Sequence, residues 1–241
     1  MECSGLPKIW ITRGFVRLAL VLVASMLAAC ASGIRSEVTR PALTHPDLRI
    51  QLLDLFNRDQ RARREMLRAI KGAPKGEDGR TIYPERAMPL VEAARSIDAE
   101  STAFVESMID QYGWPTFDMV GRDGANAAWL LAQHADEHPE LQQRALALMK
   151  PLADAGQADP AKLAYLTDRV LVAQRTNQIY GTQFTADPDG IQRPFPIEDA
   201  EQVDKRRARV GLPPMKTAAR QWERSVSIKT SPHPLDSFPD R

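Results

Sequence analysis

The sequence is poor in cysteine, in net charge and in recognisable catalytic motifs. Among 241 residues there are two cysteines, and 32 basic residues nearly balance 31 acidic ones. The net charge is close to zero, whereas a nucleic-acid-binding protein normally carries an excess of basic residues, so we expect no nucleic-acid partner. No HExxH zinc motif, no GxSxG nucleophile motif and no phosphate-binding loop occurs, so no motif marks an enzyme class.

An apolar run from about residue 18 to residue 29 is the clearest targeting signal in the chain. It is too short for a transmembrane helix, which needs about 20 residues, and basic residues precede it as in a secretory signal peptide. The run ends in Leu27-Ala28-Ala29-Cys30, which resembles the lipobox of bacterial lipoproteins. The resemblance implies cleavage before Cys30 and acylation of this cysteine, palmitate included. An ordinary signal peptide and an uncleaved anchor with a chance cysteine remain as alternatives.

Cleavage at this position has consequences for the rest of the chain. Cys3 would leave with the signal peptide and Cys30 would carry lipid. No thiol then remains for a disulfide, a cysteine-based metal site or a cysteine nucleophile. No aspartate directly follows Cys30, and similarity to the sorting rules of Gram-negative lipoproteins therefore implies the outer membrane. We expect a protein of the cell envelope whose partner is the lipid bilayer, held by more than one acyl chain.

Apolar residues recur at helical spacing from residue 47 onward, and no alternation typical of strands persists. We therefore predict an all-α fold, a single compact domain of about six to seven helices. The expected organisation is a signal peptide at 1–29, a lipidated N-terminus and tether at 30–46, the helical domain at 47–226 and a disordered tail at 227–241. Proline and glycine punctuation places helices at about 47–71, 89–112, 123–136, 139–155, 160–180 and 197–210, with a shorter one after Pro214 and a loop at 184–196.

Polar side chains interrupt the apolar face of the predicted helix at 123–136. Gln133 and His134 lie next to Leu130 and Leu131 on the face expected to be buried, and buried polar groups need partners. They indicate either a functional site or a hydrogen-bonded core histidine. His138 stands one turn later and could complete a metal-binding pair, but Pro139 disturbs that turn and no motif places an acidic ligand. We therefore predict no metal and no cofactor.

A second polar feature begins on the predicted helix at 160–180. Asp168 stands in an apolar stretch, so we expect a partner for its carboxylate, either in a helix-packing ion pair or in a site. Gln178, Tyr180 and Gln183 follow near the end of that helix. Their amide and hydroxyl groups suit an uncharged polar ligand, such as a sugar or a peptide, or else anchor a loop by bonding to the backbone.

The chain resembles a family of uncharacterised bacterial helical proteins through an ordered series of short motifs. The series covers about residues 48–214 and consists of DQxxR at 59–63, YGWP at 112–115 with VG at 120–121, QHAD at 133–136, YLxDRV at 165–170, YGTQ at 180–183 and DxRR at 204–207 with GLP at 211–213. The resemblance implies an unassigned function and transfers no catalytic residue. It implies that one polar centre between the helices contains Asp59, Gln60, Arg63, Gln133, His134, Asp168, Arg169, Tyr180 and Gln183.

Two function classes follow from these observations. The first is a membrane-anchored lipoprotein that binds a neutral polar ligand or an envelope protein, or acts structurally, through a polar centre around Gln133, His134, Asp168 and Gln183. The alternative is an envelope hydrolase in which His134 is the general base, with Asp168 and an arginine, Arg63 or Arg169, as further catalytic candidates. Convergence of His134, Asp168 and Gln183 on an open pocket would favour a ligand site, and a sealed network would favour a structural role.

Overall fold

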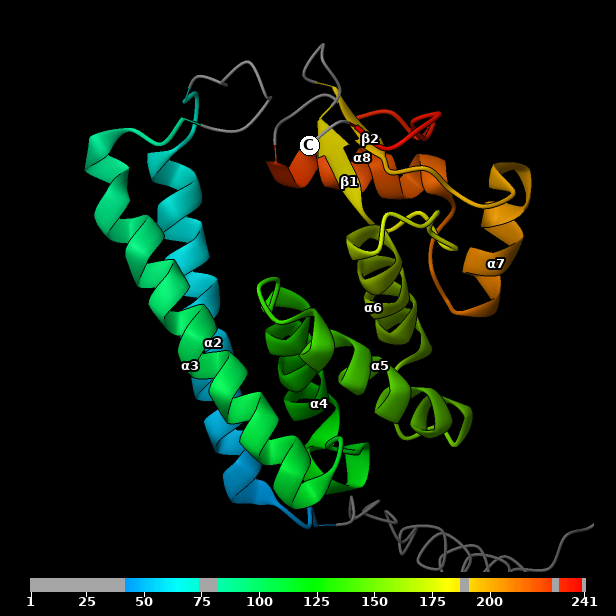
Figure 1. Ribbon diagram of the computed structural model, residues 1–241. Helices are drawn as coiled ribbons and strands as arrows, with labels where there is room; N and C mark the ends of the chain where they lie inside the picture. Colours follow the sequence, from blue (N-terminus) through cyan, green and yellow to red (C-terminus); the bar gives the residue numbers. More distant parts are fainter. Residues whose placement is uncertain (1–41, 74–81, 187–190, 227–229, 240–241) are drawn as a thin grey trace, which may run out of the picture. The chain divides into compact units, whose positions relative to one another are not determined.

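The computed structural model describes residues 42–73, 82–186, 191–226 and 230–239 (Figure 1). Seven α-helices, two short 3-10 helices and one two-stranded sheet lie within these residues. The predicted lipobox at Cys30 and most of the tether lie outside them. The all-α fold class is confirmed.

The first three described helices surround the main apolar core. Helix α2 (Pro46–Ala69) lies beside α3 (Met88–Tyr112), and α4 (Phe117–His134) packs against both α2 and α3 (Figure 1). The 3-10 helix η1 (Glu85–Ala87) directly precedes α3. Leu52 of α2, Val105 of α3 and Leu131 of α4 are all buried in this core. Helical spacing of apolar residues therefore predicted α2 and α3 to within about two residues.

Helix α4 begins earlier than expected because its first turn has its own cap. The Thr116 side chain accepts a hydrogen bond from the amide of Met119, and the helix is then interrupted at Gly121, where φ is +73°. A left-handed residue of this kind ends regular helix locally, and glycine adopts it without steric cost. The helix ends at His134 rather than at residue 136.

Helices α5 (Pro139–Asp154) and α6 (Pro160–Ala173) pack against each other. The expected bounds of α5 are confirmed, but the prediction that the next helix reaches residue 180 is wrong. Helix α6 ends at Ala173, and Arg175 has a left-handed φ of +55°. The chain turns back there, so that amides near Tyr180 meet a carboxylate of α6, as described below.

The segment predicted as a loop at 184–196 contains a short hairpin. Strand β1 (Phe184–Ala186) pairs antiparallel with β2 (Gln192–Pro194), with Phe184 opposite Pro194. Three residues a strand are too few for a detectable alternation of apolar and polar side chains, so sequence periodicity missed them.

The C-terminal part forms a second, smaller apolar cluster. A 3-10 helix, η2 (Ala200–Gln202), and α7 (Val203–Arg209) replace the longer helix predicted at 197–210, and α8 (Met215–Val226) follows. Ile197, Val203 and Met215 are buried together there, with Phe184 against them. The left-handed φ of +39° at Asp199 prevents one continuous helix.

Part of the expected disordered tail has defined backbone partners. The amides of Ser231 and Leu235 donate to the carbonyls of Gln192 and Pro194 on β2. Phe238 stacks on Phe195, with ring centroids 5.7 Å apart. None of the helices described above is long and apolar enough to cross a membrane.

Candidate functional site

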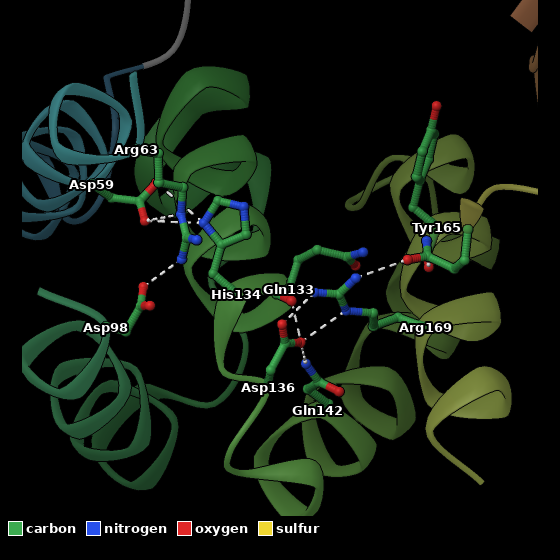
Figure 2. A network of polar contacts seen from close by, with 10 residues as sticks. Asp59, Arg63, Asp98, Gln133, His134, Asp136, Gln142, Tyr165 and Arg169 are labelled. Atoms are coloured by element: carbon green, nitrogen blue, oxygen red, sulfur yellow. Dashed lines mark hydrogen bonds and ion pairs between the residues drawn. The ribbon is translucent and has the colours of Figure 1, made fainter. Parts of the chain in front are cut away.

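An acidic residue of α2 holds the histidine at the end of α4. Asp59 lies seven residues after Leu52 and four after Leu55, so it continues the buried stripe of α2 toward α4. His134 Nδ1 lies 3.0 Å from Oδ1 and 3.1 Å from Oδ2 of Asp59. The other ring nitrogen of His134 points away from Asp59 (Figure 2) and has no partner among the described residues.

Two further side chains of α2 and one of α3 complete this group. Arg63 Nε donates to Asp59 Oδ1 over 2.8 Å, and Gln60 Nε2 donates to Asp59 Oδ2 over 2.9 Å. Arg63 Nη2 also forms an ion pair with Asp98 (Figure 2). We call Asp59, Gln60, Arg63, Asp98 and His134 the dyad cluster.

Burial and charge act in opposite directions on the two carboxylates of the dyad cluster. Burial by itself would raise the pKa of Asp59, but the hydrogen bond and charge of His134, with the charge of Arg63, lower it below its usual value. Burial raises the pKa of Asp98 despite the opposing charge of Arg63. Of the two carboxylates, Asp59 is the one whose ionised form is favoured relative to its ordinary pKa, which suits it to hold a histidine proton.

A pocket of about 270 Å³ opens beside the dyad cluster. Arg63, Asp98 and His134 line it, together with Tyr83 before η1, residues of α3 such as Thr102, and His138 in the turn between α4 and α5. Its walls thus combine a histidine held by a carboxylate, a guanidinium and an aromatic side chain. Such convergence of a few polar groups in a concave site is typical of ligand-binding and catalytic sites.

A second polar group lies on the other side of the end of α4 (Figure 2). Arg169 on α6 binds Asp136 through two hydrogen bonds, of 2.9 Å from Nε and 2.6 Å from Nη2, and reaches Gln183 Oε1 through Nη1 over 3.0 Å. Gln142 Nε2 donates to the backbone oxygen of Gln133 over 3.2 Å. This group ties the turn after His134 to α6 and to the segment after it.

Asp168 is fully buried and is satisfied by the backbone that follows α6. Its carboxylate accepts from the amides of Ile179 at 2.8 Å, Tyr180 at 3.0 Å and Thr182 at 2.9 Å, and from the Thr182 hydroxyl at 3.0 Å. Burial raises the pKa of Asp168, while these hydrogen bonds oppose that effect. Asp168 therefore anchors a loop and faces no open pocket.

Gln178 is sealed in the same way as Asp168. Its Nε2 donates to the backbone oxygens of Gln183 and Phe195, and its Oε1 accepts from the amide of Gln183. The predicted anchoring of a loop by amide-to-backbone bonds describes this residue. Gln178 was one of the residues expected to bind a neutral ligand. Its carboxamide is instead fully used in hydrogen bonds to the backbone.

Comparison with known proteins gives a family and no function. Residues 46–231 match the family of unknown function DUF6624. This chain belongs to that family. No curated protein and no solved structure matches it.

The polar centre predicted for this DUF6624 chain divides into separate groups. Asp59, Gln60, Arg63 and His134 meet in the dyad cluster, whereas Arg169 and Gln183 meet Asp136. Asp168 is not the partner of His134, because both of its oxygens are held by residues 179–182. Tyr180 takes part through its backbone amide, and the carboxamide Oε1 of Gln133 is buried without a partner in the described structure.

The DUF6624 chain also has groups of side chains that could be considered as metal ligands. Asp59, Asp98 and His134 offer ligand atoms within 4.8 Å of one another. Arg63, however, binds both carboxylates and supplies the positive charge that a metal ion would bring. His138 belongs to a different group, with Glu106 and Glu140, so the suggested pairing of His134 with His138 does not form.

Sequence reasoning missed Asp98. It lies on α3, whose neighbouring positions are mostly exposed, and nothing in the local pattern distinguishes it from a solvated aspartate. Asp59 was named through the family resemblance, and the stripe of Leu48, Leu52 and Leu55 points to it independently, because it takes the next place on the same face.

Proposed function

We propose that this DUF6624 protein is a lipid-anchored protein of the cell envelope, attached to the outer membrane through acylated Cys30. The support is the apolar run at 18–29, its basic flank and the small residues before the cysteine. Metabolic labelling with an alkyne analogue of palmitate tests this. Wild type and a Cys3→Ser control should be labelled and should sediment with membranes, whereas Cys30→Ser should be unlabelled. Label on Cys30→Ser would contradict the proposal.

We further propose that the helical domain is a hydrolase in which the Asp59–His134 dyad activates water. The observation that carries this proposal is the placement of His134 Nδ1 at 3.0 Å from Asp59, with the second ring nitrogen directed away from the carboxylate and the histidine on the wall of a pocket. A carboxylate on Nδ1 favours the tautomer that leaves a lone pair on Nε2. Asp59 thus takes the role first considered for Asp168.

The chemistry follows from this tautomer. Nε2 removes a proton from water as the water oxygen attacks an electrophilic centre of the substrate, and the imidazolium then returns that proton to the leaving group. Asp59 orients the ring and stabilises its positive charge during the reaction. Arg63 lines the same pocket and its Nη1 has no acceptor among the described residues, so this guanidinium is available to bind a substrate oxygen that gains negative charge.

A binding or structural role without turnover is the second candidate. The observation that favours it is the pairing of Asp59 with Arg63 and His134 and of Asp98 with Arg63, which a purely structural network would also show. In that case the pocket would hold a ligand, or an envelope protein, without chemical change.

Nitrogen-15 NMR of histidine-labelled full-length protein in detergent micelles tests the dyad independently of any substrate. The chain has four histidines, and the His134→Gln variant identifies the signal of interest. We expect a protonated Nδ1 and an unprotonated Nε2 in the neutral ring, and loss of this preference in Asp59→Asn. A wild-type ring protonated on Nε2 would contradict the hydrolase proposal.

Turnover is measured on p-nitrophenyl acetate, p-nitrophenyl phosphate and isolated peptidoglycan sacculi. His134→Gln should abolish hydrolysis and Asp59→Asn should reduce it by about 10²-fold or more, because a positioned general base contributes about that much. His233→Gln, a change at an exposed histidine, serves as the control and should retain full activity. Hydrolysis that survives in His134→Gln would exclude the dyad as its source.

A further inference from the structure

A second pocket, of about 290 Å³, lies between α6, β1, α7 and α8. Tyr165, Phe184 and Trp222 contribute aromatic side chains to it, and Arg207 and Gln221 contribute polar ones. It shares no lining residue with the pocket of the dyad cluster. Its size is near the lower end of small-molecule sites, which is about 300 Å³.

Arg207 is the unusual residue of this pocket, because it is a buried cation with no carboxylate beside it. It is 1% exposed, and within the described structure it forms no ion pair. Nε donates to the Pro213 carbonyl over 2.6 Å, and Nη1 donates to the carbonyls of Tyr180 and Gly181 over 2.6 and 3.3 Å. Nη2 has no acceptor among the described residues.

A buried charge costs stability unless it is paired. Three carbonyl oxygens compensate part of the charge of Arg207, while Asp168 and Asp204 act on it only through space. Because Arg207 lines the pocket, an anionic oxygen bound beside it would supply the acceptor that Nη2 lacks. Guanidinium groups bind carboxylates through short, strong hydrogen bonds.

The pocket also has an aromatic lining. Phe184 and Trp222 stack with their ring centroids 5.9 Å apart and their planes inclined by 13°. Trp222 is 43% exposed, so part of its side chain is open to solvent. Flat aromatic faces of this kind pack against the C–H bonds of a ring, and the Gln221 carboxamide beside them offers a donor and an acceptor to hydroxyl or acetamido groups.

We propose that this pocket binds a saccharide that carries a carboxylate. The carboxylate would bind Arg207 Nη2, the sugar ring would pack on Phe184 and Trp222, and Gln221 would bond to a ring substituent. This site is separate from the dyad cluster and does not depend on the hydrolase proposal.

Three small probes test the contributions of Arg207 and of the aromatic side chains separately. Their binding is measured by isothermal titration calorimetry on the full-length protein, in a detergent without a sugar headgroup. N-acetylmuramic acid has the ring and the carboxylate, N-acetylglucosamine has the ring alone, and lactate has the carboxylate alone. We expect N-acetylmuramic acid to bind at least tenfold more tightly than either of the others. Equal binding of N-acetylglucosamine would overturn the role of Arg207, and equal binding of lactate would overturn the role of the aromatic wall.

Variants then locate the binding. Trp222→Ala and Gln221→Ala change exposed residues of α8, so the melting temperature should change little. Trp222→Ala should weaken N-acetylmuramic acid binding at least tenfold, and Gln221→Ala about threefold. Tyr112→Ala is the matched control, because Tyr112 is 40% exposed and lies on α3 outside this pocket. Binding that is absent in the wild type, or that is unchanged in Trp222→Ala, would overturn the proposal and leave Arg207 with a structural role only.

Discussion

His134 and Asp59 are 75 positions apart in the sequence, yet His134 Nδ1 lies 3.0 Å from Asp59 Oδ1. The contact joins the last residue of α4 to the middle of α2, at the place where the apolar stripe of α2 reaches the polar cluster. The carboxylate is 2% exposed, so its hydrogen bonds form in surroundings where water competes little.

Replacement of Asp59 by asparagine should destabilise the protein in a pH-dependent way. The pKa of Asp59 in the folded protein lies below its ordinary value of 3.8, so its carboxylate contributes stability that is fully present above that pH. This contribution is lost as the pH falls through the lower folded-state pKa. Urea unfolding of wild type and Asp59→Asn should differ by about 1.5–3 kcal/mol near neutral pH, the range for hydrogen bonds to charged groups.

The difference between the two proteins should shrink as the pH is lowered below 3.8. Asp54→Asn is the control on the same helix, because Asp54 is exposed and makes a single long ion pair of 3.8 Å with Arg58. It should change the free energy of unfolding by less than about 0.5 kcal/mol. A gap between wild type and Asp59→Asn that stayed constant down to the lowest pH would contradict the assigned ionisation of Asp59.

Removal of the Asp168 carboxylate should destabilise the fold more than any change in the dyad cluster. Asp168→Ala leaves the amides of Ile179, Tyr180 and Thr182 without their acceptor. Each orphaned buried donor costs about 1–3 kcal/mol, so we expect a loss of at least about 3 kcal/mol in the free energy of unfolding, measured with urea.

Asp154→Ala provides the comparison for this result. Asp154 is an exposed aspartate at the end of α5, and the change should alter stability by no more than about 0.5 kcal/mol. If Asp168→Ala were as stable as Asp154→Ala, the anchoring role of Asp168 would be wrong.

Two glycines with similar backbone angles should respond differently to alanine. Gly181 and Gly211 have φ values of +67° and +75°, so both substitutions impose a left-handed alanine, at about 1–2 kcal/mol. A Cβ at Gly181 would also lie 2.7 Å from Ile197 Cδ1 and 2.8 Å from Met215 Sδ, whereas one at Gly211 would have no atom within 4 Å. Thermal unfolding should therefore show the lower melting temperature for Gly181→Ala, and equal values would refute the crowding at this position.

Local sequence patterns predicted the helix ends that are marked by a proline or a glycine. Apolar spacing together with Pro139 and Gly113 was sufficient for α5 and for the end of α3. The end of α6 could not be predicted in this way, since the residues that follow Ala173 continue an acceptable helical pattern. The chain leaves the helix there and returns so that the amides of Ile179 and Tyr180 bind the Asp168 carboxylate, which is a tertiary effect.

The candidate site shows the same division. His134 was recognisable as a polar residue on an apolar helix face, but its partner could not be chosen between Asp59 and Asp168 from one sequence. The pairing depends on how α2 and α4 pack, and Asp98 joins through Arg63 from a third helix. Contacts between elements that are distant in sequence carry no local periodicity.

The order in which the chain is synthesised bears on the segment held by Arg206 and Arg207. These arginines donate to the backbone oxygens of Ile179, Tyr180 and Gly181, and Arg207 also takes the carbonyl of Pro213. The arginines that bind the carbonyls of residues 179–181 follow 26 or 27 positions later in the chain, so these carbonyls gain their partners only after Arg206 and Arg207 have been made. A nascent chain that stops short of Arg206 would carry completed α2 to α6 helices followed by a segment without its backbone partners, and early termination there should leave a product that proteases recognise.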